Sequence, residues 1–308
     1  MEPRIAGIVP CYNEEVAIAT VVRDLRAAVP DMDIYVYDNN STDKTAEVAA
    51  AAGAIVRRED EKGKGNVVRR AFADIDADIY LLIDGDDTYA ASAARTLIDT
   101  LISGPYDHVL GVRRQAASES SAYRPGHETG NKAFNRLVSW LFGRRVSDML
   151  SGYRVFSRRF VKSFPALSRE FEIETELTVH SMNLRVPQVE VEVGFKDRPV
   201  GSESKLRTYH DGFRILGLIG ALLRHERPLF FYGVLAAILY VIAIVLGVPV
   251  IWEFVQTGLV PRFPTAILAS SLALLGTLAL SIGLILDGVL LARREQARLR
   301  YLEYTAPR

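Results

Sequence analysis

Residues 79–88 read Ile-Tyr-Leu-Leu-Ile-Asp-Gly-Asp-Asp-Thr, and this stretch decides the fold. Its apolar run, 79–83, predicts a strand buried on both faces, which is typical of a parallel sheet covered by helices. The acidic residues follow at the carboxyl end of that strand, the edge where open α/β sheets bind ligands. In an extended segment residues i and i+2 point the same way, so Asp84 and Asp86 would address one ligand. Such paired carboxylates suit Mg²⁺ or Mn²⁺, which would in turn bridge a diphosphate.

The segments around this strand alternate between β-rich and helical patterns. This alternation predicts an α/β fold, a Rossmann-like and mostly parallel sheet with helices on both faces. Connections between parallel strands are right-handed, so the carboxyl ends of the strands line one edge. The expected strands are 5–9, 34–37, 55–56 and 109–110, and the expected helices are 16–28, 45–52, 66–73 and 90–103.

Polar residues also follow the other predicted strands. Asn13 and Glu14 come after the first strand, and Asp38 ends the second, where it could hydrogen-bond a ribose or a base edge. Asp43 falls in the first turn of the next helix, where it could equally cap the helix or contact a ligand. No G-x-G-x-x-G follows a strand, and no G-x-x-x-x-G-K-[ST] occurs. We therefore expect carboxylates and a metal, instead of a glycine-rich loop, to hold a phosphate-bearing ligand.

The composition excludes other classes of protein. The 308 residues carry 37 Lys plus Arg and 37 Asp plus Glu, and this zero balance argues against nucleic acid as a partner. Hydrophobic residues make up 49% of the chain, which argues against intrinsic disorder. The single cysteine, Cys11, cannot form an internal disulfide, and a reduced thiol suits the cytosol.

Two uncharged runs near the C-terminus, Leu229–Trp252 and Phe263–Leu286, each contain 24 residues. About 20 apolar residues cross a bilayer core, so the runs predict two transmembrane helices at about 229–252 and 264–287. The segment between them carries only Glu253 and Arg262. Basic residues lie just before the first span and just after the second. The positive-inside rule then places both ends of the hairpin and the head in the cytosol, as in a multi-pass protein of the cytoplasmic membrane. These flanking residues are Arg224, His225, Arg227, Arg293, Arg294, Arg298 and Arg300.

The expected domain organisation follows from these segments. Residues 1–207 form the cytosolic head, and residues 208–228 form an amphipathic helix that lies along the lipid headgroups. The hairpin of two spans occupies residues 229–292, and residues 293–308 form a cytosolic basic tail. A homo-oligomer is compatible with two spans, but the sequence leaves the oligomeric state open.

Five motifs follow one another along the chain: PCYNEE (10–15), DNNSTD (38–43), GKG (63–65), DGD (84–86) and SDMLSGYR (147–154). In this order and spacing they resemble family-2 glycosyltransferases of the GT-A fold across roughly residues 5–205. The stretch 198–206 (RPVGSESKL) and the paired spans resemble most closely the polyprenyl-phosphate glycosyltransferases, which are similar to dolichyl-phosphate mannose synthase. One departure is Thr88, which stands where many members carry Gln or a similar group.

The resemblance implies a role for each matching residue. Asp86 would bind the metal, and Asp84 would contact the sugar or ribose and share in metal binding. A second set would hold the nucleotide sugar, linked through UDP or GDP, with Lys64 near the base or ribose. A basic set would lie near the donor or acceptor phosphates. The nucleotide-sugar set is Pro10, Tyr12, Asn13, Glu14, Asp38, Asn40, Asp43, Lys64 and Asp84, and the basic set is Arg113, Arg124, Lys132, Arg154, Arg198 and Lys205.

The nature of the acceptor decides whether a general base is needed. A phosphate with a second pKa of about 6 is mostly a dianion at neutral pH, so an undecaprenyl- or dolichyl-type phosphate could attack the anomeric carbon directly, with inversion. The alternative is non-processive transfer to a glycan or another hydroxyl, which requires a base, and Asp148 is the best candidate. Among Glu172, Glu174 and Glu176, helical spacing puts 172 and 176 on one face, and one of these two could look into the cleft or remain solvated.

Overall fold

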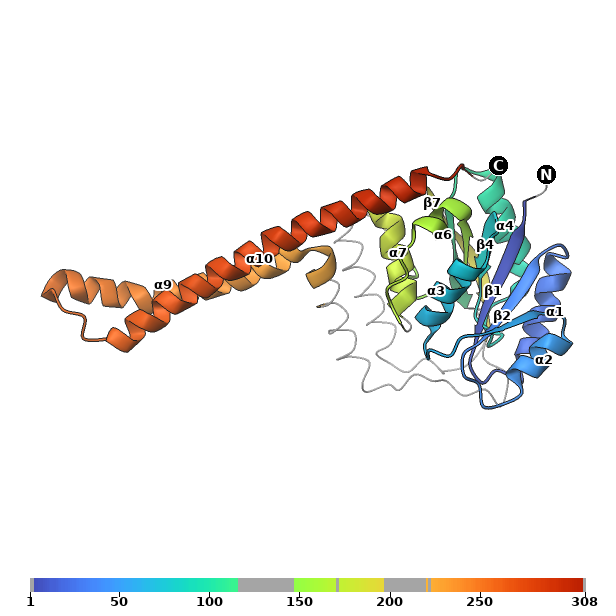
Figure 1. The fold of residues 1–308 in the computed structure, drawn as a ribbon, viewed down its shortest axis with the longest axis horizontal. Helices are drawn as coiled ribbons and strands as arrows, with labels where there is room; N and C mark the ends of the chain where they lie inside the picture. The colour runs from blue at the N-terminus through green and yellow to red at the C-terminus, as the bar shows by residue number, and fades with distance from the viewer. Residues whose placement is uncertain (1–2, 116–146, 170–171, 197–219, 221–222, 307–308) are drawn as a thin grey trace. The chain divides into compact units, whose positions relative to one another are not determined.

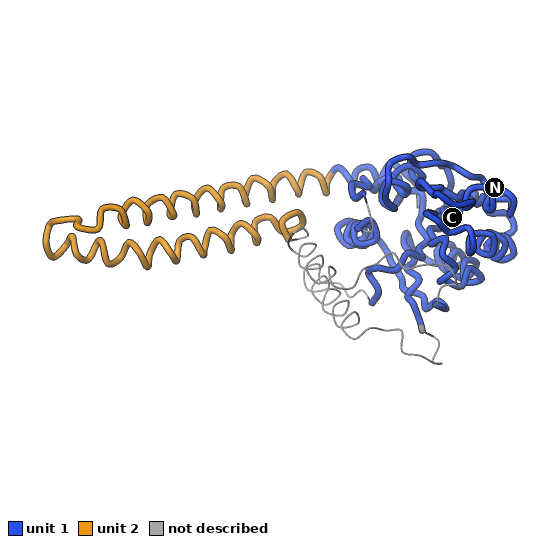
Figure 2. Tube along the Cα trace, turned by 90° about the horizontal axis from the view of Figure 1, so that it is seen from below, with its two compact units in different colours: residues 1–206, 296–308 blue, residues 207–295 orange. Residues whose placement is uncertain are grey.

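The computed structural model describes residues 3–115, 147–169, 172–196, 220 and 223–306. The chain forms two compact units, which Figure 2 shows in different colours. The first unit consists of Met1–Leu206 together with Gln296–Arg308, and the second consists of Arg207–Glu295. The predictions for Arg124, Lys132, Arg198 and Lys205, and for most of the juxtamembrane helix, concern residues outside those that the structure describes.

The first unit is built on one sheet with the strand order β3-β2-β1-β4-β6-β5-β7 (Figure 1). Strands β1, β2, β3 and β4 are parallel, β6 is antiparallel to both of its neighbours, and β7 is parallel to β5. The expectation of a mostly parallel sheet is therefore confirmed. The strands are β1 (Ile5–Cys11), β2 (Asp33–Asp38), β3 (Ile55–Arg58), β4 (Ile79–Leu82), β5 (His108–Gln115), β6 (Arg154–Ser157) and β7 (Gln188–Phe195).

The register brings the ends of several strands to one edge. Cys11 at the end of β1 lies beside Asp38 at the end of β2. The next strand along, β6, runs in the opposite direction, so its first residue, Arg154, lies beside Leu82 at the end of β4. The segment before β6 therefore reaches the same edge as the loops that follow β1, β2 and β4.

Helices cover both faces of the sheet, and each face has its own apolar core. On β4, Ile79 and Leu81 pack with α1 (Ile18–Ala28) and α4 (Ala94–Ser103), whereas Tyr80 and Leu82 face the opposite core. This alternation is the two-residue period of a strand that is buried on both sides. Helix α2 (Thr45–Ala51) and the short 3-10 turn η1 (Ala91–Ala93) border the first core, and α3 (Lys64–Asp74), α6 (Arg158–Ser163) and α7 (Glu172–Leu184) cover the second.

The second unit contains two long helices, α9 (Pro228–Thr257) and most of α10 (Phe263–Leu302). Both are long and apolar enough to cross a membrane, and they coincide with the two predicted spans. Helix α10 has 40 residues and continues through the region expected to be a basic tail. Ala, Leu, Arg, Gln and Glu fill this stretch, and all of them are strong helix formers, which explains the continuation.

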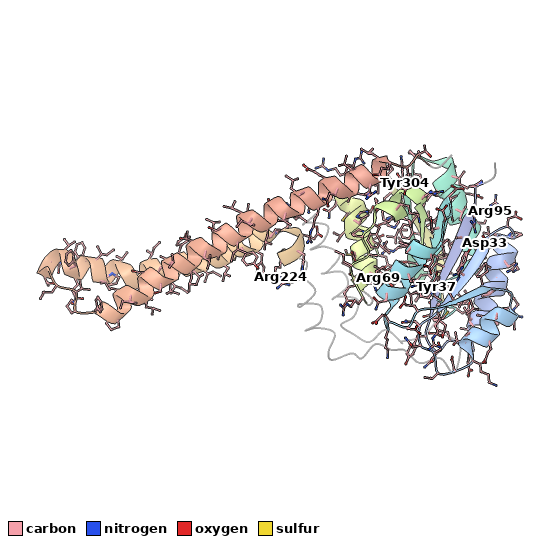
Figure 3. The ribbon with its side chains drawn as sticks, viewed as in Figure 1. Asp33, Tyr37, Arg69, Arg95, Arg224 and Tyr304 are labelled. Carbon is pink, nitrogen blue, oxygen red and sulfur yellow. The ribbon has the colours of Figure 1, made fainter. Side chains whose placement is uncertain are left out.

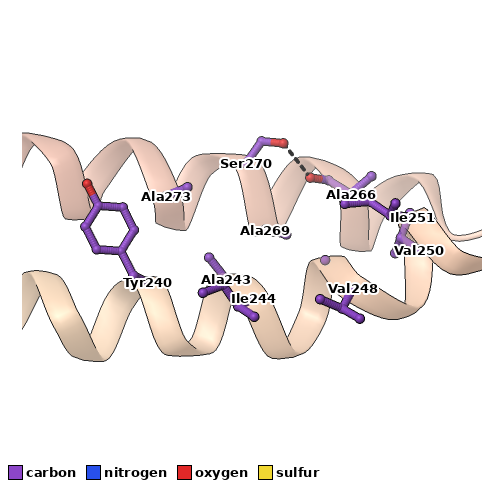
Figure 4. A pocket seen from close by; sticks show the side chains of 11 residues that line it. Tyr240, Ala243, Ile244, Val248, Val250, Ile251, Ala266, Ala269, Ser270 and Ala273 are labelled. Carbon is purple, nitrogen blue, oxygen red and sulfur yellow. Dashed lines mark hydrogen bonds between the residues drawn. The ribbon is translucent and has the colours of Figure 1, made fainter.

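The hairpin places small residues inside and large apolar residues outside. Ala236, Ala243 and Ala269 are buried between the helices, while Leu274 is 71% exposed. A hydrogen bond of 2.8 Å joins the hydroxyls of Tyr240 and Thr277 across the pair. Between the helices lies a cavity of about 350 Å³ with an almost wholly apolar lining (Figure 4). Small interfacial residues with apolar side chains directed outward are typical of helices packed in lipid.

The residues that follow the hairpin are part of the first unit. The Tyr301 hydroxyl donates a hydrogen bond of 2.7 Å to Asp107, a fully buried carboxylate that also accepts two bonds from Arg159. The Arg159 guanidinium in turn lies over the Tyr301 ring. Tyr304, labelled in Figure 3, faces Arg158 in a second cation–π contact. The end of the chain, expected to be a separate tail, is therefore docked on the sheet domain.

Candidate active site

The loops after β1 and β2 are locked together by side chain to backbone hydrogen bonds. The Asn13 Oδ1 atom accepts from the backbone of Thr42 at 2.8 Å. The backbone N–H groups of Asn13 and Glu14 donate to the hydroxyls of Ser41 and Thr45, at 2.9 and 2.8 Å. Asn13 has a φ of 54°, a left-handed conformation that asparagine tolerates better than most residues. The network fixes the edge where we expected the nucleotide to lie.

Two of the residues predicted to bind nucleotide have structural contacts there. The Asn40 amide donates to the carbonyl of Asp60 at 2.8 Å. Asp43 accepts from the backbone and hydroxyl of Thr45 at the start of α2, and from the backbone of Glu15. Burial acts to raise the pKa of Asp43, but these hydrogen bonds outweigh it and the pKa is lowered. Helix α2 begins at Thr45, so the expected place of Asp43 in its first turn is wrong. Asp43 lies two residues before the helix and accepts the N–H of its first residue, and its predicted contact with a ligand stays a prediction.

The remaining residues of that set lie at the same edge. Pro10 is part of β1, and Asp38 is buried as the last residue of β2, where its Oδ1 accepts from the backbone of Ser41. Tyr12 follows β1, and the Lys62 ammonium lies 4.9 Å from the centre of its ring. Their predicted contacts with a nucleotide stay predictions.

The acidic motif forms a turn instead of an extended segment. Strand β4 ends at Leu82, and Gly85 and Asp86 form the turn, so the assumption that residues 84–86 are extended is wrong. The Asp86 carboxylate accepts from the hydroxyl and backbone of Thr88, at 2.6 and 3.2 Å. Any side chain at position 85 would overlap the Cys11 sulfur, and glycine is therefore needed at this point. The turn therefore packs closely against the end of β1 at Gly85.

A buried ion cluster lies beside this turn. The Lys64 ammonium at the start of α3 bonds both the Asp84 carboxylate and the Glu174 carboxylate of α7, the latter at 2.5 Å. Side chains of Lys64 and Glu174 are each 7% exposed, whereas that of Asp84 is 28% exposed. The sequence reasoning placed Lys64 near a base or ribose, but the structure directs its ammonium to these two acids.

Burial and the neighbouring charges shift the pKa values of the cluster. Burial by itself would lower the pKa of Lys64, but attraction to Asp84 and Glu174 outweighs burial, and the pKa is raised. The pKa of Glu174 is raised, first by burial and then by the neighbouring negative charge of Asp84, while Lys64 acts in the opposite direction. One buried cation therefore serves two carboxylates, of which Glu174 is buried and Asp84 is partly exposed.

Asp148 and Arg113 form a second ion pair near the same edge. The Arg113 guanidinium donates two hydrogen bonds to Asp148, at 2.6 and 2.7 Å, in the bidentate geometry that arginine favours with carboxylates. Burial acts to lower the pKa of Arg113, but the bond to Asp148 outweighs it and the pKa is raised. Asp148 was our candidate base, and both of its oxygens are held by a cation.

Arg154 is placed differently from our expectation of a phosphate contact. Its side chain is fully buried, and it donates to the carbonyls of Ser151 and Met149 and to the hydroxyl of Thr178. Burial lowers the pKa of Arg154 to about 10. A guanidinium with no solvent exposure and three short protein bonds has a structural task, which is to hold the segment before β6 against α7. We therefore do not assign Arg154 to a phosphate.

Glu174 is the site residue that sequence reasoning missed. Helical spacing alone favoured 172 and 176, but Glu176 accepts the backbone N–H groups of Leu167 and Ser168, at 2.9 and 2.8 Å. The signal that could have found Glu174 is the apolar stripe of Ile173 and Leu177, both fully buried. Position 174 lies three residues before Leu177, and it therefore shares the inward face of α7.

The edge carries oxygen donors of the kind that a divalent cation can share with a ligand. Within the parts of the chain that the structure describes, no three His, Cys, Asp or Glu side chains gather into a protein-only metal site. Mg²⁺ is usually held by one or two carboxylates together with substrate phosphates. The carboxylates of Asp84 and Asp86 belong to the same turn at the sheet edge, and they match this donor set.

Comparison with known proteins identifies the family of this chain. The family model described as glycosyl transferase family 2 matches residues 8–164. The glycosyltransferase AglJ of Haloferax volcanii is 33% identical over 292 residues, which cover 94% of this chain and 95% of that protein. The dolichyl-phosphate hexose transferase of the same organism is 29% identical over 211 residues, which cover 68% of this chain and 90% of that protein.

A solved structure shows the same fold. Glucosyl-3-phosphoglycerate synthase from Mycobacterium tuberculosis, in complex with Mn²⁺, UDP-glucose and phosphoglyceric acid, matches with a TM-score of 0.59 and 22% identity. The match covers 72% of this chain and 79% of that one. Because the family model spans half of the sequence and AglJ aligns along nearly all of it, this chain belongs to glycosyl transferase family 2 and is a glycosyltransferase.

Proposed function

We propose that this glycosyltransferase moves a sugar from a UDP- or GDP-linked donor to a polyprenyl phosphate at the cytosolic face of a membrane. The observation that carries the proposal is the presence, in one chain, of the glycosyltransferase sheet and of two helices able to span a membrane. An acceptor with its isoprenoid chain in the bilayer and its phosphate at the surface requires an enzyme held at that surface. The names of relatives that act on dolichyl or undecaprenyl phosphate support the same acceptor class.

The state of Asp148 also favours a phosphate acceptor over a hydroxyl. Removing a proton from a hydroxyl needs a base placed to accept it at the reacting atom. Both carboxylate oxygens of Asp148 accept bonds from Arg113, so the geometry pairs this acid with a cation and orients it toward that cation. A phosphate dianion needs no base, and we propose direct attack on the anomeric carbon with inversion of configuration. The sugar–diphosphate bond breaks as the sugar–phosphate bond forms, and the nucleoside diphosphate leaves.

Different residues of this chain would bind the nucleotide, the metal and the acceptor phosphate. Asp38 and the interlocked loops at 11–15 and 38–45 would orient the nucleotide, and Asp84 would contact the donor sugar or ribose. Asp84 and Asp86 would hold Mg²⁺ or Mn²⁺, which when bound would neutralise the charge that develops on the leaving diphosphate. Arg113, with guanidinium N–H groups beyond those bonded to Asp148, would face the acceptor phosphate.

A labelling experiment tests the proposal. Membranes that contain the full chain are incubated with a panel of labelled UDP- and GDP-sugars and with polyprenyl phosphate. We expect label to enter the organic phase in a product that is labile to mild acid, and we expect chelation to abolish transfer until Mg²⁺ or Mn²⁺ is restored. Label found only in water-soluble glycan would overturn the lipid acceptor and favour the hydroxyl alternative. Undiminished transfer after exhaustive chelation would overturn the metal.

A further inference from the structure

We propose that Glu174 is a positioning residue for the donor site, acting through Lys64 to fix the Asp84 carboxylate. The inference rests on the proposed function in one respect, which is that Asp84 contacts the donor or its metal. Nothing in the sequence motifs points to Glu174, because it comes 90 residues after Asp84 on a separate helix. The structure brings the two acids onto one ammonium.

The order of exposure within the cluster supports this division of roles. The side chain of Asp84 is 28% exposed, so it can meet a ligand, whereas Lys64 and Glu174 are each 7% exposed. The Lys64 ammonium has three N–H donors, and its two carboxylate bonds tie the exposed acid to the buried one. Glu174 therefore reaches the donor site only through its neighbour.

The backbone around Asp84 leaves its carboxylate little freedom. One oxygen bonds Lys64, and the other lies against Gly152, where any added side chain would overlap the carboxylate. The Gly152 N–H is held in turn by the Tyr89 hydroxyl at 2.9 Å. Because Gly152 blocks one side, the position of Lys64 on the other side sets the orientation of Asp84.

The interface between α3 and α7 holds Glu174 itself in place. Gly65 packs so closely on the backbone of Ser168 and Arg169 that no side chain fits there. The Asn66 N–H donates to the Arg169 carbonyl at 3.2 Å, and Glu176 binds the backbone of the same segment from α7. The segment 167–169 thus joins the two helices that carry Lys64 and Glu174.

The charge balance explains why the second acid is needed. With Glu174 present, Lys64 lies between two carboxylates that pull on it from different elements. Replacement by glutamine keeps the volume and an acceptor oxygen but removes one negative charge, so the ammonium is drawn toward Asp84 alone. We expect Asp84 to become more strongly neutralised and less well placed for a cation or a sugar hydroxyl.

A double-mutant cycle tests the inference. The four full-length proteins are wild type, Glu174→Gln, Lys64→Met and the double variant, with Glu172→Gln on the same helix as the matched control. Each is measured for KM and kcat with the nucleotide sugar, and for binding of UDP and GDP in the presence of Mn²⁺. Thermal unfolding accompanies each measurement. We expect Glu174→Gln to lower kcat/KM about 10- to 100-fold, the loss typical of residues that orient a metal-binding side chain without touching the metal themselves.

Coupling decides between positioning and direct participation. If Glu174 acts through Lys64, Glu174→Gln causes no further loss once Lys64 is methionine. Equal losses in both backgrounds would overturn the inference, because they would mean that Glu174 touches the reactants itself. A loss that follows only the melting temperature would also overturn it. Binding of UDP and GDP does not depend on the acceptor. If the lipid acceptor is assigned wrongly, the wild-type protein still binds the nucleotide, so this error is distinguished from a wrong role for Glu174.

Discussion

The sheet domain and the hairpin differ in whether charged side chains are buried. Beside its two apolar cores, the sheet domain buries charged groups, including Lys64, Asp107 and Arg154, each with partners at hydrogen-bonding distance. In the hairpin the interior holds alanines, and the surface carries leucines such as Leu274. This contrast is typical of a domain that folds in water, where charge is accepted at the surface, and of a helix pair that packs in lipid, where the outward groups are apolar.

The largest effect on sugar transfer is expected from replacing Asp86, the acid in the turn after β4. Asp86→Asn should lower transfer at least 100-fold, about 2.7 kcal/mol, because the change removes the charge that would hold a cation against the diphosphate. The measurement is kcat/KM for the nucleotide sugar at saturating Mg²⁺ or Mn²⁺. Asp99→Asn is the matched control, since Asp99 is an exposed acid in an ordinary ion pair with Arg95. Near-normal transfer by a folded Asp86→Asn protein would exclude the metal role.

A direct test of the comparison places one charge at two equally exposed leucines. Leu274 in the hairpin is 71% exposed, and Leu167 in the sheet domain is 69% exposed. Leu274→Arg should disfavour membrane insertion by about 2.5–3.5 kcal/mol, the cost of arginine near the centre of a span. Leu167→Arg should change stability by less than about 0.5 kcal/mol.

The readout for this pair is the fraction of protein that is membrane-integrated after alkaline extraction. Loss confined to Leu274→Arg would support lipid around the hairpin. Equal behaviour of the two variants would mean that the exposed apolar surface of α9 and α10 is covered by something other than lipid.

The sequence predicted correctly that the loops after several strands meet at one edge, because strand periodicity is local. The apolar run at 79–83 and the polar residues after each strand were enough to predict that the loops after β1, β2 and β4 lie together. The antiparallel β6 was not predicted, since only four residues, 154–157, form it and their direction depends on pairing between β4 and β5. Because β6 runs antiparallel to its neighbours, the segment before it, which contains Asp148, reaches the same edge.

Interactions between distant helices account for what sequence reasoning missed. The meeting of Lys64 with Glu174 depends on how α3 packs on α7, and the spacing of three glutamates along one helix does not contain that information. Arg154 is similar, because its motif is compatible with phosphate binding and only the fold reveals that its guanidinium is buried. The docked C-terminus was missed because a run of arginines after a span resembles a solvated flank until Tyr301 meets Asp107.

The docked C-terminus gives a smaller effect, of about 1.5 kcal/mol. Tyr301→Phe removes a hydrogen bond to a buried, charged acceptor and leaves its packing in place. Burial raises the pKa of Tyr301, so the hydroxyl remains a donor throughout the physiological range. Thermal or denaturant unfolding of the sheet domain in the full chain is the measurement. Tyr304→Phe serves as control, and an equal effect of the two changes would contradict a specific role for the Asp107 contact.

The smallest effect is expected inside the hairpin, where the hydroxyls of Tyr240 and Thr277 form a polar contact between apolar helices. Thr277→Val removes the bond to Tyr240 and should weaken hairpin packing by about 0.6 kcal/mol, the average for hydrogen bonds between membrane helices. Ser281→Ala is the control, because the Ser281 hydroxyl bonds the Thr277 carbonyl within its own helix. Reversible unfolding in bicelles measures both. A cost for Thr277→Val as large as that of Tyr301→Phe would mean that polar contacts are as strong in the hairpin as in the sheet domain, and the contrast between the two interiors would then lie in composition alone.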